Sequence, residues 1–194
     1  MLLDRTFAQL GENFSLSAED KRALQQALRP KQLKQGQFFV EAGEICGEIA
    51  ILHTGIFRTF YLANDKEYTS YFNTEDRNPI VGAFTSFLRQ QPSAESVVAL
   101  EDSTHQSISK EELEGLYESH PNIQKMGRLL AEYNYVLAME RIYDLQHSDA
   151  KTRYEKFLAL YPNVINRIPH YHIASYIGVT PESLSRLRKS VARN

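Results

Sequence analysis

Residues 170–189 read HYHIASYIGVTPESLSRLRK, and this stretch decides how the end of the chain folds. Counted from His170, Ala174 is the fifth residue, where a second helix can cross closely. Gly178 is the ninth, where the chain turns and φ is expected to be positive. Thr180 and Pro181 follow as a cap and a first helical residue. The pattern predicts a helix-turn-helix. Its apolar anchors are Ile173, Ile177, Val179, Leu184 and Leu187.

The second predicted helix separates into an apolar and a polar face. Leu184, Leu187 and Val191 share one side at helical spacing, and the opposite side is polar and basic. Arginine can donate two hydrogen bonds to guanine, glutamate can accept from cytosine, and serine suits either base. We therefore expect this face to bind double-stranded DNA. The base-reading side holds Glu182, Ser185, Arg186, Lys189 and Arg193, and the phosphate contacts are Thr180, Ser183 and Arg188. An ordinary helical hairpin with a solvated charged face is the alternative.

The charge of the chain is unevenly distributed and agrees with this expectation. The 194 residues carry a formal charge of −2. Residues 1–140 hold 13 Lys and Arg against 20 Asp and Glu, a net −7, whereas residues 141–194 hold 9 against 4, a net +5. A basic end on an acidic body indicates that the end alone meets a polyanion. A solvated basic end is the other interpretation.

The middle of the chain is typical of antiparallel β-structure. Between about Lys34 and Ser109, short apolar runs such as 49–52, 59–62 and 97–100 alternate with glycine, asparagine and proline turns. Many short strands at close spacing favour a barrel or roll. Residues 82–92 interrupt this region as a loop with at most one helical turn.

Cap signals predict the helices around the roll. Ser17 opens a short helix that Pro30 ends, and Ser109 with Glu112 forms a capping box. A long helix follows, and Ser148 starts another, which stops at Pro162. Residues 162–169 are too few for a β-hairpin wing before the helix-turn-helix.

The long helix from Pro121 to about Leu145 carries two apolar stripes. One stripe can cover the β-domain of its own chain. The other needs a partner, and the same helix of a second copy is the simplest one. We therefore expect a homodimer through residues 121–147, with burial within one chain as the alternative. The stripes are Ile123, Met126, Leu130, Tyr133 and Leu137, and Leu129, Val136, Met139 and Tyr143.

Several classes of function find no support in the sequence. A single cysteine, Cys46, cannot form an internal disulfide or supply the roughly four thiolates of an iron–sulfur cluster. No phosphate loop, nucleophile elbow or histidine set for a metal site occurs. We expect no catalytic residue, no metal and no membrane span, and a cytoplasmic protein. The role of Cys46 is left open.

Taken over nearly its whole length, the chain resembles the CRP/FNR transcription regulators. The most specific part is residues 173–187, in which Glu182, Ser185 and Arg186 match the common recognition-helix pattern of that family. Residues 36–44 and 51–58 are similar to the first strands and turns of its β-roll. The resemblance implies an α+β fold with an N-terminal antiparallel, cyclic-nucleotide-binding-like jelly roll, flanking helices, a long dimerisation helix and an all-α helix-turn-helix domain. The expected domains are 1–120, 121–147 and 148–194. RNA polymerase is implied as a further partner.

The loop that would hold an effector departs from the cyclic AMP-binding members of that family. Gly82 is kept, but Ala83 stands where those members place a ribose-binding glutamate. Where an arginine would pair with the cyclic phosphate, the chain has Ser93 to Ser96, including Glu95, which repels a phosphate. The candidate ligand residues are Gly82, Ala83, Phe84, Ser86, Ser93, Ala94, Glu95 and Ser96.

Two functions follow as hypotheses. The first is a dimeric, sequence-specific transcription regulator that senses an unidentified small molecule or nucleotide, or no ligand, with cyclic AMP disfavoured by the loop sequence. The second is a ligand-binding or protein-interaction module with a vestigial helix-turn-helix.

Overall fold

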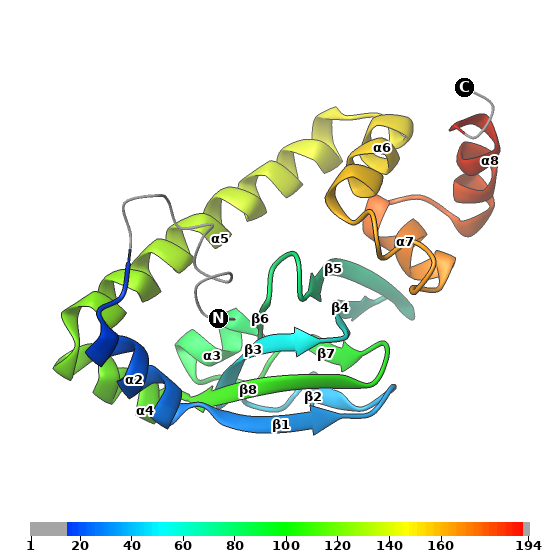
Figure 1. Cartoon of the computed structure of the whole chain (residues 1–194). Coiled ribbons are helices and arrows are strands. Elements are labelled where there is room, and N and C mark those ends of the chain that lie inside the picture. The colour runs from blue at the N-terminus through cyan, green and yellow to red at the C-terminus, as the bar shows by residue number, and fades with distance from the viewer. Residues whose placement is uncertain (1–14, 192–194) are drawn as a thin grey trace.

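The structure is a computed structural model that describes residues 15–191 of the chain. A β-roll occupies the N-terminal part, and three helices occupy the C-terminal part. The long helix α5 (Pro121–His147) joins them, running from one end of the roll to the C-terminal helices (Figure 1). This is the expected α+β architecture.

In the described part of the chain, eight strands form two antiparallel four-stranded sheets. Their orders are β1-β8-β3-β6 and β2-β7-β4-β5, so β5 is the edge strand of the second sheet. The strands are β1 (Arg29–Leu33), β2 (Phe38–Val40), β3 (Glu48–Thr54), β4 (Ile56–Ala63), β5 (Lys66–Thr74), β6 (Ile80–Val81), β7 (Glu95–Ala99) and β8 (Ser103–Ser109).

Apolar side chains of the two sheets form the core of the roll. Leu52 of β3, Phe57 of β4 and Val97 of β7 are fully buried there. Helix α3 (Phe84–Arg89) lies in the connection between β6 and β7. Burial of such side chains, at roughly 25 cal/mol per Å² of apolar surface, is the main stabilising term of the roll.

Two capped helices and the start of α5 lie together at one end of the roll (Figure 1). Both capping boxes are present, that of Ser17 on α2 (Ala18–Ala27) and that of Ser109 on α4 (Lys110–Ser119). From α5, Ile123 and Met126 are buried in the core of the roll. The first part of the long helix is therefore fixed to the β-domain of its own chain.

Two helix boundaries differ from the sequence expectation. The first helix ends at Ala27, and Pro30 lies within β1, opposite Gln106. A proline is tolerated there because β1 is an edge strand, whose proline needs no N–H for the ladder. The helix after α5 is capped by Asp149 rather than Ser148, because the Asp149 carboxylate accepts from Thr152 N–H at 2.7 Å.

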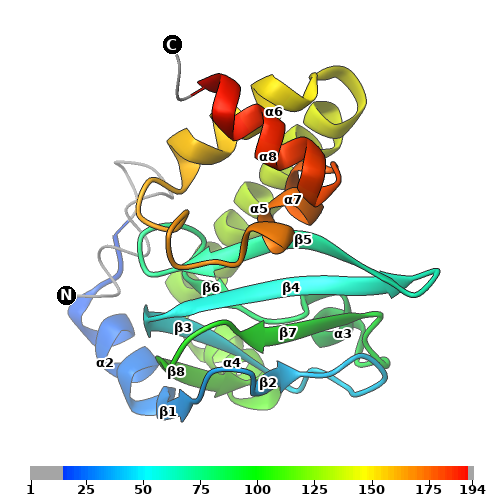
Figure 2. The same cartoon turned by 90° about the vertical axis from the view of Figure 1, so that its right-hand side faces the viewer.

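The C-terminal helices share a second core with the roll. They are α6 (Ala150–Leu160), α7 (His170–Ile177) and α8 (Pro181–Val191), and they lie over the β4–β5 side of the roll (Figure 2). Phe72 of β5 is fully buried among them, and its ring meets that of Tyr161 edge-on, with centroids 6.1 Å apart. The unit of α6, α7 and α8, called the helical unit below, is thus packed onto the roll.

Polar contacts fix the same arrangement. The Ser175 hydroxyl on α7 accepts a hydrogen bond from the Thr69 N–H and donates one to the Glu67 carbonyl, both at 2.9 Å. It satisfies backbone groups that an edge strand would otherwise leave open. Nearby, buried Arg58 pairs with Glu67 at 2.6 Å. Burial and the charge of Arg58 lower the pKa of the buried His172 of α7 to about 4, so its imidazole is neutral at pH 7.

Candidate nucleic-acid interface and effector site

The turn between α7 and α8 is built around Gly178. Its φ is +71°, in the left-handed region, as the sequence predicts, and its N–H donates to carbonyls at the end of α7. A Cβ at this position would approach the Leu145 side chain to 3.3 Å, and the backbone conformation would strain any L-residue. Glycine therefore sets the angle at which α8 leaves α7.

Helix α8 is anchored through one face. Leu184 is buried to 1% exposure against Ala174 and Ile177 of α7, which are fully buried, and Leu187 packs at the edge of the same core. The helix begins at Pro181, and the Thr180 hydroxyl accepts from the Ser183 N–H at 3.3 Å. Figure 1 shows α8 at the outer end of the helical unit, so its other face is directed away from the roll.

The exposed face of α8 carries the side chains expected to read DNA. Glu182, Ser185, Arg186 and Lys189 are exposed, as is Thr180 before the helix, while Ser183 and Arg188 are half-buried. The side chain of Arg193 lies outside the described residues. Arg186 donates to the Ser183 hydroxyl at 3.3 Å, a long and easily broken contact. The guanidinium is therefore available to an incoming acceptor.

Electrostatics at the start of α8 keep Glu182 ionised. Hydrogen bonds from its own backbone N–H and from the Thr180 hydroxyl lower the pKa of its carboxyl, and the charge of Arg186 acts in the same direction. Glu182 thus offers a hydrogen-bond acceptor next to Arg186, which offers donors. A base pair that presents both a donor and an acceptor at its edge can bind such a pair of side chains. The pKa of His170, the first residue of α7, is lowered by partial burial and by the charge of Arg188. His170 and Arg188 are therefore neighbours on the surface of the molecule.

Two arginines fix α7 to the helices before it. Arg141 of α5 donates to the Tyr176 carbonyl and lies 3.9 Å over the Tyr176 ring. Arg153 of α6 donates to the Ile177 carbonyl at 2.7 Å. Cations at a helix C-terminus satisfy its open carbonyls and its dipole. The orientation of α7, and through Gly178 that of α8, is therefore tied to the end of α5.

The segment between α6 and α7 contains turns and no strand. Residues 162–167 form turns that lead directly to Pro169, the residue before α7. Arg167 in this segment pairs with Glu101 on the roll and lies 3.5 Å from Glu75. The guanidinium of Arg167 thus contributes to the contact between the roll and the helical unit.

The candidate ligand residues lie around α3, and most of their hydroxyls are already used. Ser86 accepts from the Cys46 N–H at 3.0 Å and donates to the Gln91 carbonyl at 2.5 Å. Ser93 donates to the Glu95 carbonyl at 2.7 Å, and Ser96 accepts from the Ala42 N–H at 3.0 Å. These three serines hold the loop and are not free for a ligand. Gly82 and Ala83 are buried, Phe84 is half-buried, and Ala94 is exposed.

Glu95 is the exception within this loop. Its carboxylate accepts from the Ser70 hydroxyl at 2.8 Å, and it forms no ion pair with any described residue. Burial raises the pKa of its carboxyl, and burial followed by the charge of Glu95 raises the pKa of Tyr71. The Tyr71 hydroxyl in turn makes a long contact, 3.4 Å, to the Gly82 carbonyl, and the nearby Thr59 hydroxyl acts on its pKa in the opposite direction. A negative charge therefore stands where a phosphate site would need a positive one.

Sequence reasoning missed Thr59, Ser70 and Tyr71 as members of this site. They lie on β4 and β5, far along the chain from Glu95, which is the first residue of β7. The alternation of inner and outer residues could have placed Thr59 on the same side as Phe57. It could not show that β4 pairs with both β5 and β7, which brings these residues to Glu95.

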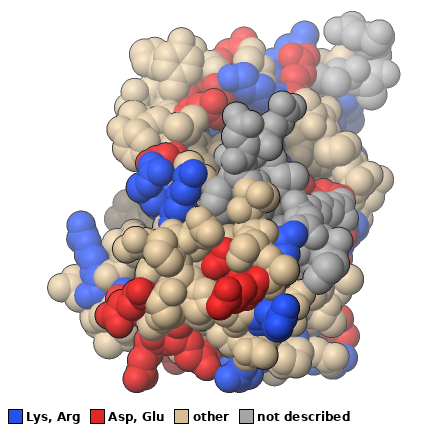
Figure 3. All heavy atoms as spheres, turned by 60° about the vertical axis from the view of Figure 1, so that its left-hand side comes forward, with Lys and Arg blue, Asp and Glu red and all other residues tan. Residues whose placement is uncertain are grey.

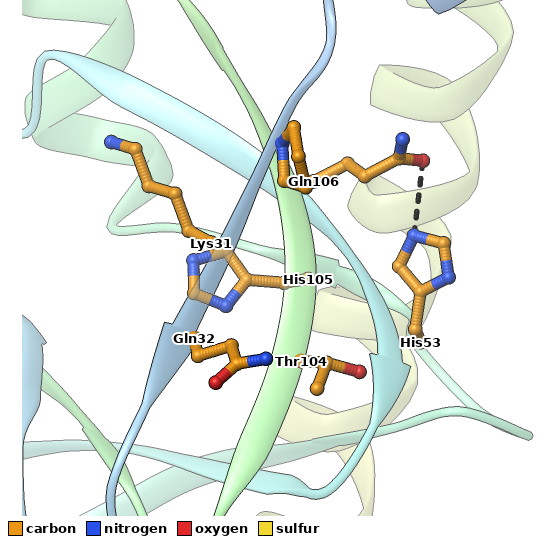
Figure 4. Close-up of a pocket in the computed structure, with 7 residues that line it drawn as sticks. Lys31, Gln32, His53, Thr104, His105 and Gln106 are labelled. Carbon is orange, nitrogen blue, oxygen red and sulfur yellow. Dashed lines mark hydrogen bonds between the residues drawn. The ribbon is translucent and has the colours of Figure 1, made fainter.

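A separate hollow of about 400 Å³ lies beside β1, β3 and β8. In Figure 4 the side chains of His53 and Gln106 point toward each other, and His53 Nε2 lies 3.0 Å from Gln106 Oε1. Lys31 at its rim is paired with Glu48 at 2.6 Å. His105 is buried, and burial lowers its pKa. Because Lys31 is paired with Glu48 and burial disfavours the charged form of His105, neither supplies a free positive charge to a ligand in this hollow.

The second half of α5 leaves large apolar side chains in contact with solvent. Val136, Met139 and Tyr143, three of the four residues of the second predicted stripe, are 52%, 46% and 61% exposed, and the fourth, Leu129, is half-buried. On the side of the molecule that carries α2 and α5, acidic and basic side chains alternate with uncharged areas and form no extended patch of one sign (Figure 3). Several large, exposed apolar side chains on one helix face are typical of an interface.

Two negative findings apply to the part of the chain that the structure describes. No three histidine, cysteine, aspartate or glutamate side chains there come together as a metal site would need. Nor does any helix there combine the length and apolar character that crossing a membrane requires.

Comparisons with known proteins agree with this architecture. Residues 30–120 match the family model of the cyclic nucleotide-binding domain. By sequence, the chain matches none of the curated proteins. FixK2 of Bradyrhizobium japonicum has a similar structure, with a TM-score of 0.71 and 16% identity over 86% of this chain and 85% of its own.

Two further solved structures extend the similarity. CLP, the c-di-GMP responsive global regulator of Xanthomonas campestris, gives a TM-score of 0.72 at 13% identity, covering 91% of this chain and 92% of its own. The catabolite activator protein of Thermus thermophilus gives 0.59 at 18%, covering 96% and 87%. The resemblance to the CRP/FNR regulators is thus confirmed at the level of the fold, with a cyclic-nucleotide-binding-type roll in residues 30–120.

Proposed function

We propose that this chain is a homodimeric, sequence-specific transcription regulator of the CRP/FNR type. The observation that carries the proposal is the division of α8, whose leucines anchor it while Glu182, Ser185 and Arg186 face solvent. In this assignment these three side chains contact base edges in the major groove. Lys189 lies on the same base-reading face, and Thr180, Ser183 and Arg188 contact the phosphates on either side.

The dimer forms through α5. The first part of this helix is buried against its own roll, whereas Val136, Met139 and Tyr143 are exposed and match the second stripe of the sequence. Pairing these stripes across a two-fold axis removes them from water. Two α8 helices then enter successive major grooves, about 34 Å apart, on a palindromic site. RNA polymerase is the partner that reads the occupied site.

The roll acts as the effector domain. Its strand β5 contributes to both parts of the molecule, since Tyr71 lies beside Glu95 and Phe72 lies in the core of the helical unit. A ligand near Glu95 that prefers one position of β5 shifts the population of helical-unit orientations, and no chemical step is needed.

The test is an electrophoretic mobility shift with the duplex upstream of the protein's own gene. Arg186→Ala should weaken binding about 30-fold or more, because each bidentate base contact contributes roughly 1–3 kcal/mol and a dimer has two. The melting temperature should not change, since Arg186 is exposed. Lys34→Ala, which removes an exposed lysine paired with Asp102 on the roll, is the matched control and should bind like the wild type. Equal affinity of Arg186→Ala and wild type would favour a protein-interaction module instead.

A further inference from the structure

Five groups from four segments of the chain form a polar cluster on the inner face of the β2-β7-β4-β5 sheet. They are Thr59, Ser70, Tyr71, the Gly82 carbonyl and Glu95, and they are called the Glu95 cluster below. Thr59 lies opposite Tyr71 on β5 and opposite Val97 on β7. Val97 is part of the core of the roll, so Thr59 shares its inward direction. Glu95 is two residues from Val97 and therefore lies on the same face.

Hydrogen-bond acceptors outnumber donors in the Glu95 cluster. The Ser70 hydroxyl is committed to Glu95 Oε1, and the Tyr71 hydroxyl reaches the Gly82 carbonyl only at 3.4 Å. Glu95 Oε2 has no hydrogen bond to any described residue. A carboxylate, a carbonyl and a phenol oxygen thus lie together, and only the hydroxyls of Tyr71 and Thr59 are left to donate to them.

Thr59 adds an independent sign that the cluster is incomplete. Its side chain is fully buried, and its hydroxyl, which lies near that of Tyr71 and lowers the pKa of Tyr71, makes no well-formed hydrogen bond to any described residue. Buried polar groups in native proteins are almost always paired, and an exception points to a group that is supplied from outside. Ser70, Tyr71 and Glu95 are half-buried, so this edge of the cluster is in contact with solvent.

The charge of the cluster selects the sign of that molecule. The carboxylate of Glu95 has no lysine, arginine or histidine as an ion-pair partner among residues 15–191, and its burial is costly without one. An anion would add a second negative charge to the same site. A cation with N–H donors would neutralise the carboxylate and donate to the Gly82 carbonyl and the Thr59 hydroxyl.

We propose that the Glu95 cluster binds a small organic cation with N–H donors, of the primary amine or guanidinium class. Glu95 supplies the counter-charge, Gly82 and Thr59 accept hydrogen bonds, and Ser70 positions the carboxylate. The proposal rests on the proposed function in one respect, because it names the class of effector of that regulator. Ligand binding itself can be measured without DNA.

The test is a thermal-shift titration of the full-length protein with agmatine, which carries one ammonium and one guanidinium group. Ionic strength is held constant with sodium chloride, and cyclic AMP is titrated in parallel. We expect agmatine to raise the melting temperature saturably, as ligands of the folded state do, and cyclic AMP to have no such effect. Glu95→Gln keeps an acceptor for Ser70 and should bind agmatine at least tenfold more weakly.

Thr59→Val separates binding from folding. It removes the unpaired hydroxyl and keeps the shape of the side chain, so the unliganded protein should melt at the same or a higher temperature. Its affinity for agmatine should nevertheless fall. The proposal is overturned if agmatine causes no saturable shift, if Glu95→Gln responds like the wild type, or if cyclic AMP stabilises the protein in place of agmatine. Each of these results leaves the mobility-shift test of DNA binding unaffected.

Discussion

The exposed face of α8 and the inner face of the sheet around Glu95 differ in both charge and surroundings. On α8, Arg186 and Lys189 project into solvent, where a polyanion can reach them. In the Glu95 cluster, a carboxylate without a counter-ion lies beside a buried, unpaired hydroxyl. A solvated cation costs little to maintain, whereas a buried carboxylate without a partner is costly. The charged side chains of α8 can thus bind a ligand without rearrangement. In the Glu95 cluster, the charge and the hydrogen bonds are balanced only when a ligand is bound.

The largest expected difference between the two regions comes from breaking the dimer. Met139→Asp places a charge on the exposed stripe of α5, where apolar side chains are proposed to meet. The protein should become monomeric and lose about 100-fold or more in DNA affinity, toward the range of non-specific binding. Agmatine binding should persist, because the Glu95 cluster lies within one chain. Analytical ultracentrifugation with the mobility shift checks this, and a dimeric variant with normal DNA affinity would contradict the α5 interface.

A smaller effect should appear in the salt dependence of binding. Arg188 is assigned to phosphate rather than to bases, so Arg188→Gln should weaken binding to all sequences alike. The slope of log affinity against log salt should fall in magnitude by about 2 for a dimer, one per arginine. Fluorescence anisotropy at four or five salt concentrations measures it. A changed sequence preference with an unchanged slope would assign Arg188 to the bases.

The smallest effect concerns stability and is confined to the enclosed region. Burial raises the folded-state pKa of Glu95 above its ordinary value of 4.5, so the folded protein binds the proton more tightly than the unfolded chain. Stability linked to Glu95 is therefore greatest below pH 4.5 and is lost as the pH rises through the folded pKa. Glu95→Gln does not titrate and should melt above the wild type at pH 7, with the gap closing toward pH 4. A gap independent of pH would contradict an ionised, unpaired Glu95.

Local patterns predicted α8 better than they predicted the Glu95 cluster, and the reason is physical. Capping, the left-handed turn at Gly178 and the spacing of Leu184 and Leu187 act over a few residues, so they can be read from the sequence. The Glu95 cluster depends on pairing between β4, β5 and β7, whose partners are up to about 40 residues apart. The alternation of a strand shows on which face of the sheet a residue lies. It does not show which residue of the neighbouring strand lies opposite.

The contact between the roll and the helical unit was equally hidden from sequence reasoning. Ser175 reads as an ordinary helical serine, yet it bonds to Thr69 and Glu67 on the edge strand. Phe72 reads as one residue of a strand, yet it completes the core of the helical unit. Contacts between domains leave no period in the sequence, because the residues that make them are scattered over several elements of each side.

The central claim is that two copies of α8 read one palindromic duplex, and selection from random DNA tests it most directly. The wild-type protein is incubated with a library of random duplexes, and the bound fraction is amplified and sequenced. The account predicts an enriched inverted repeat whose half-sites are centred about one helical turn apart, and Arg186→Ala should lose the enrichment at specific positions in both halves. Recovery of sequences without a preferred base, or of one unrepeated half-site, would contradict it.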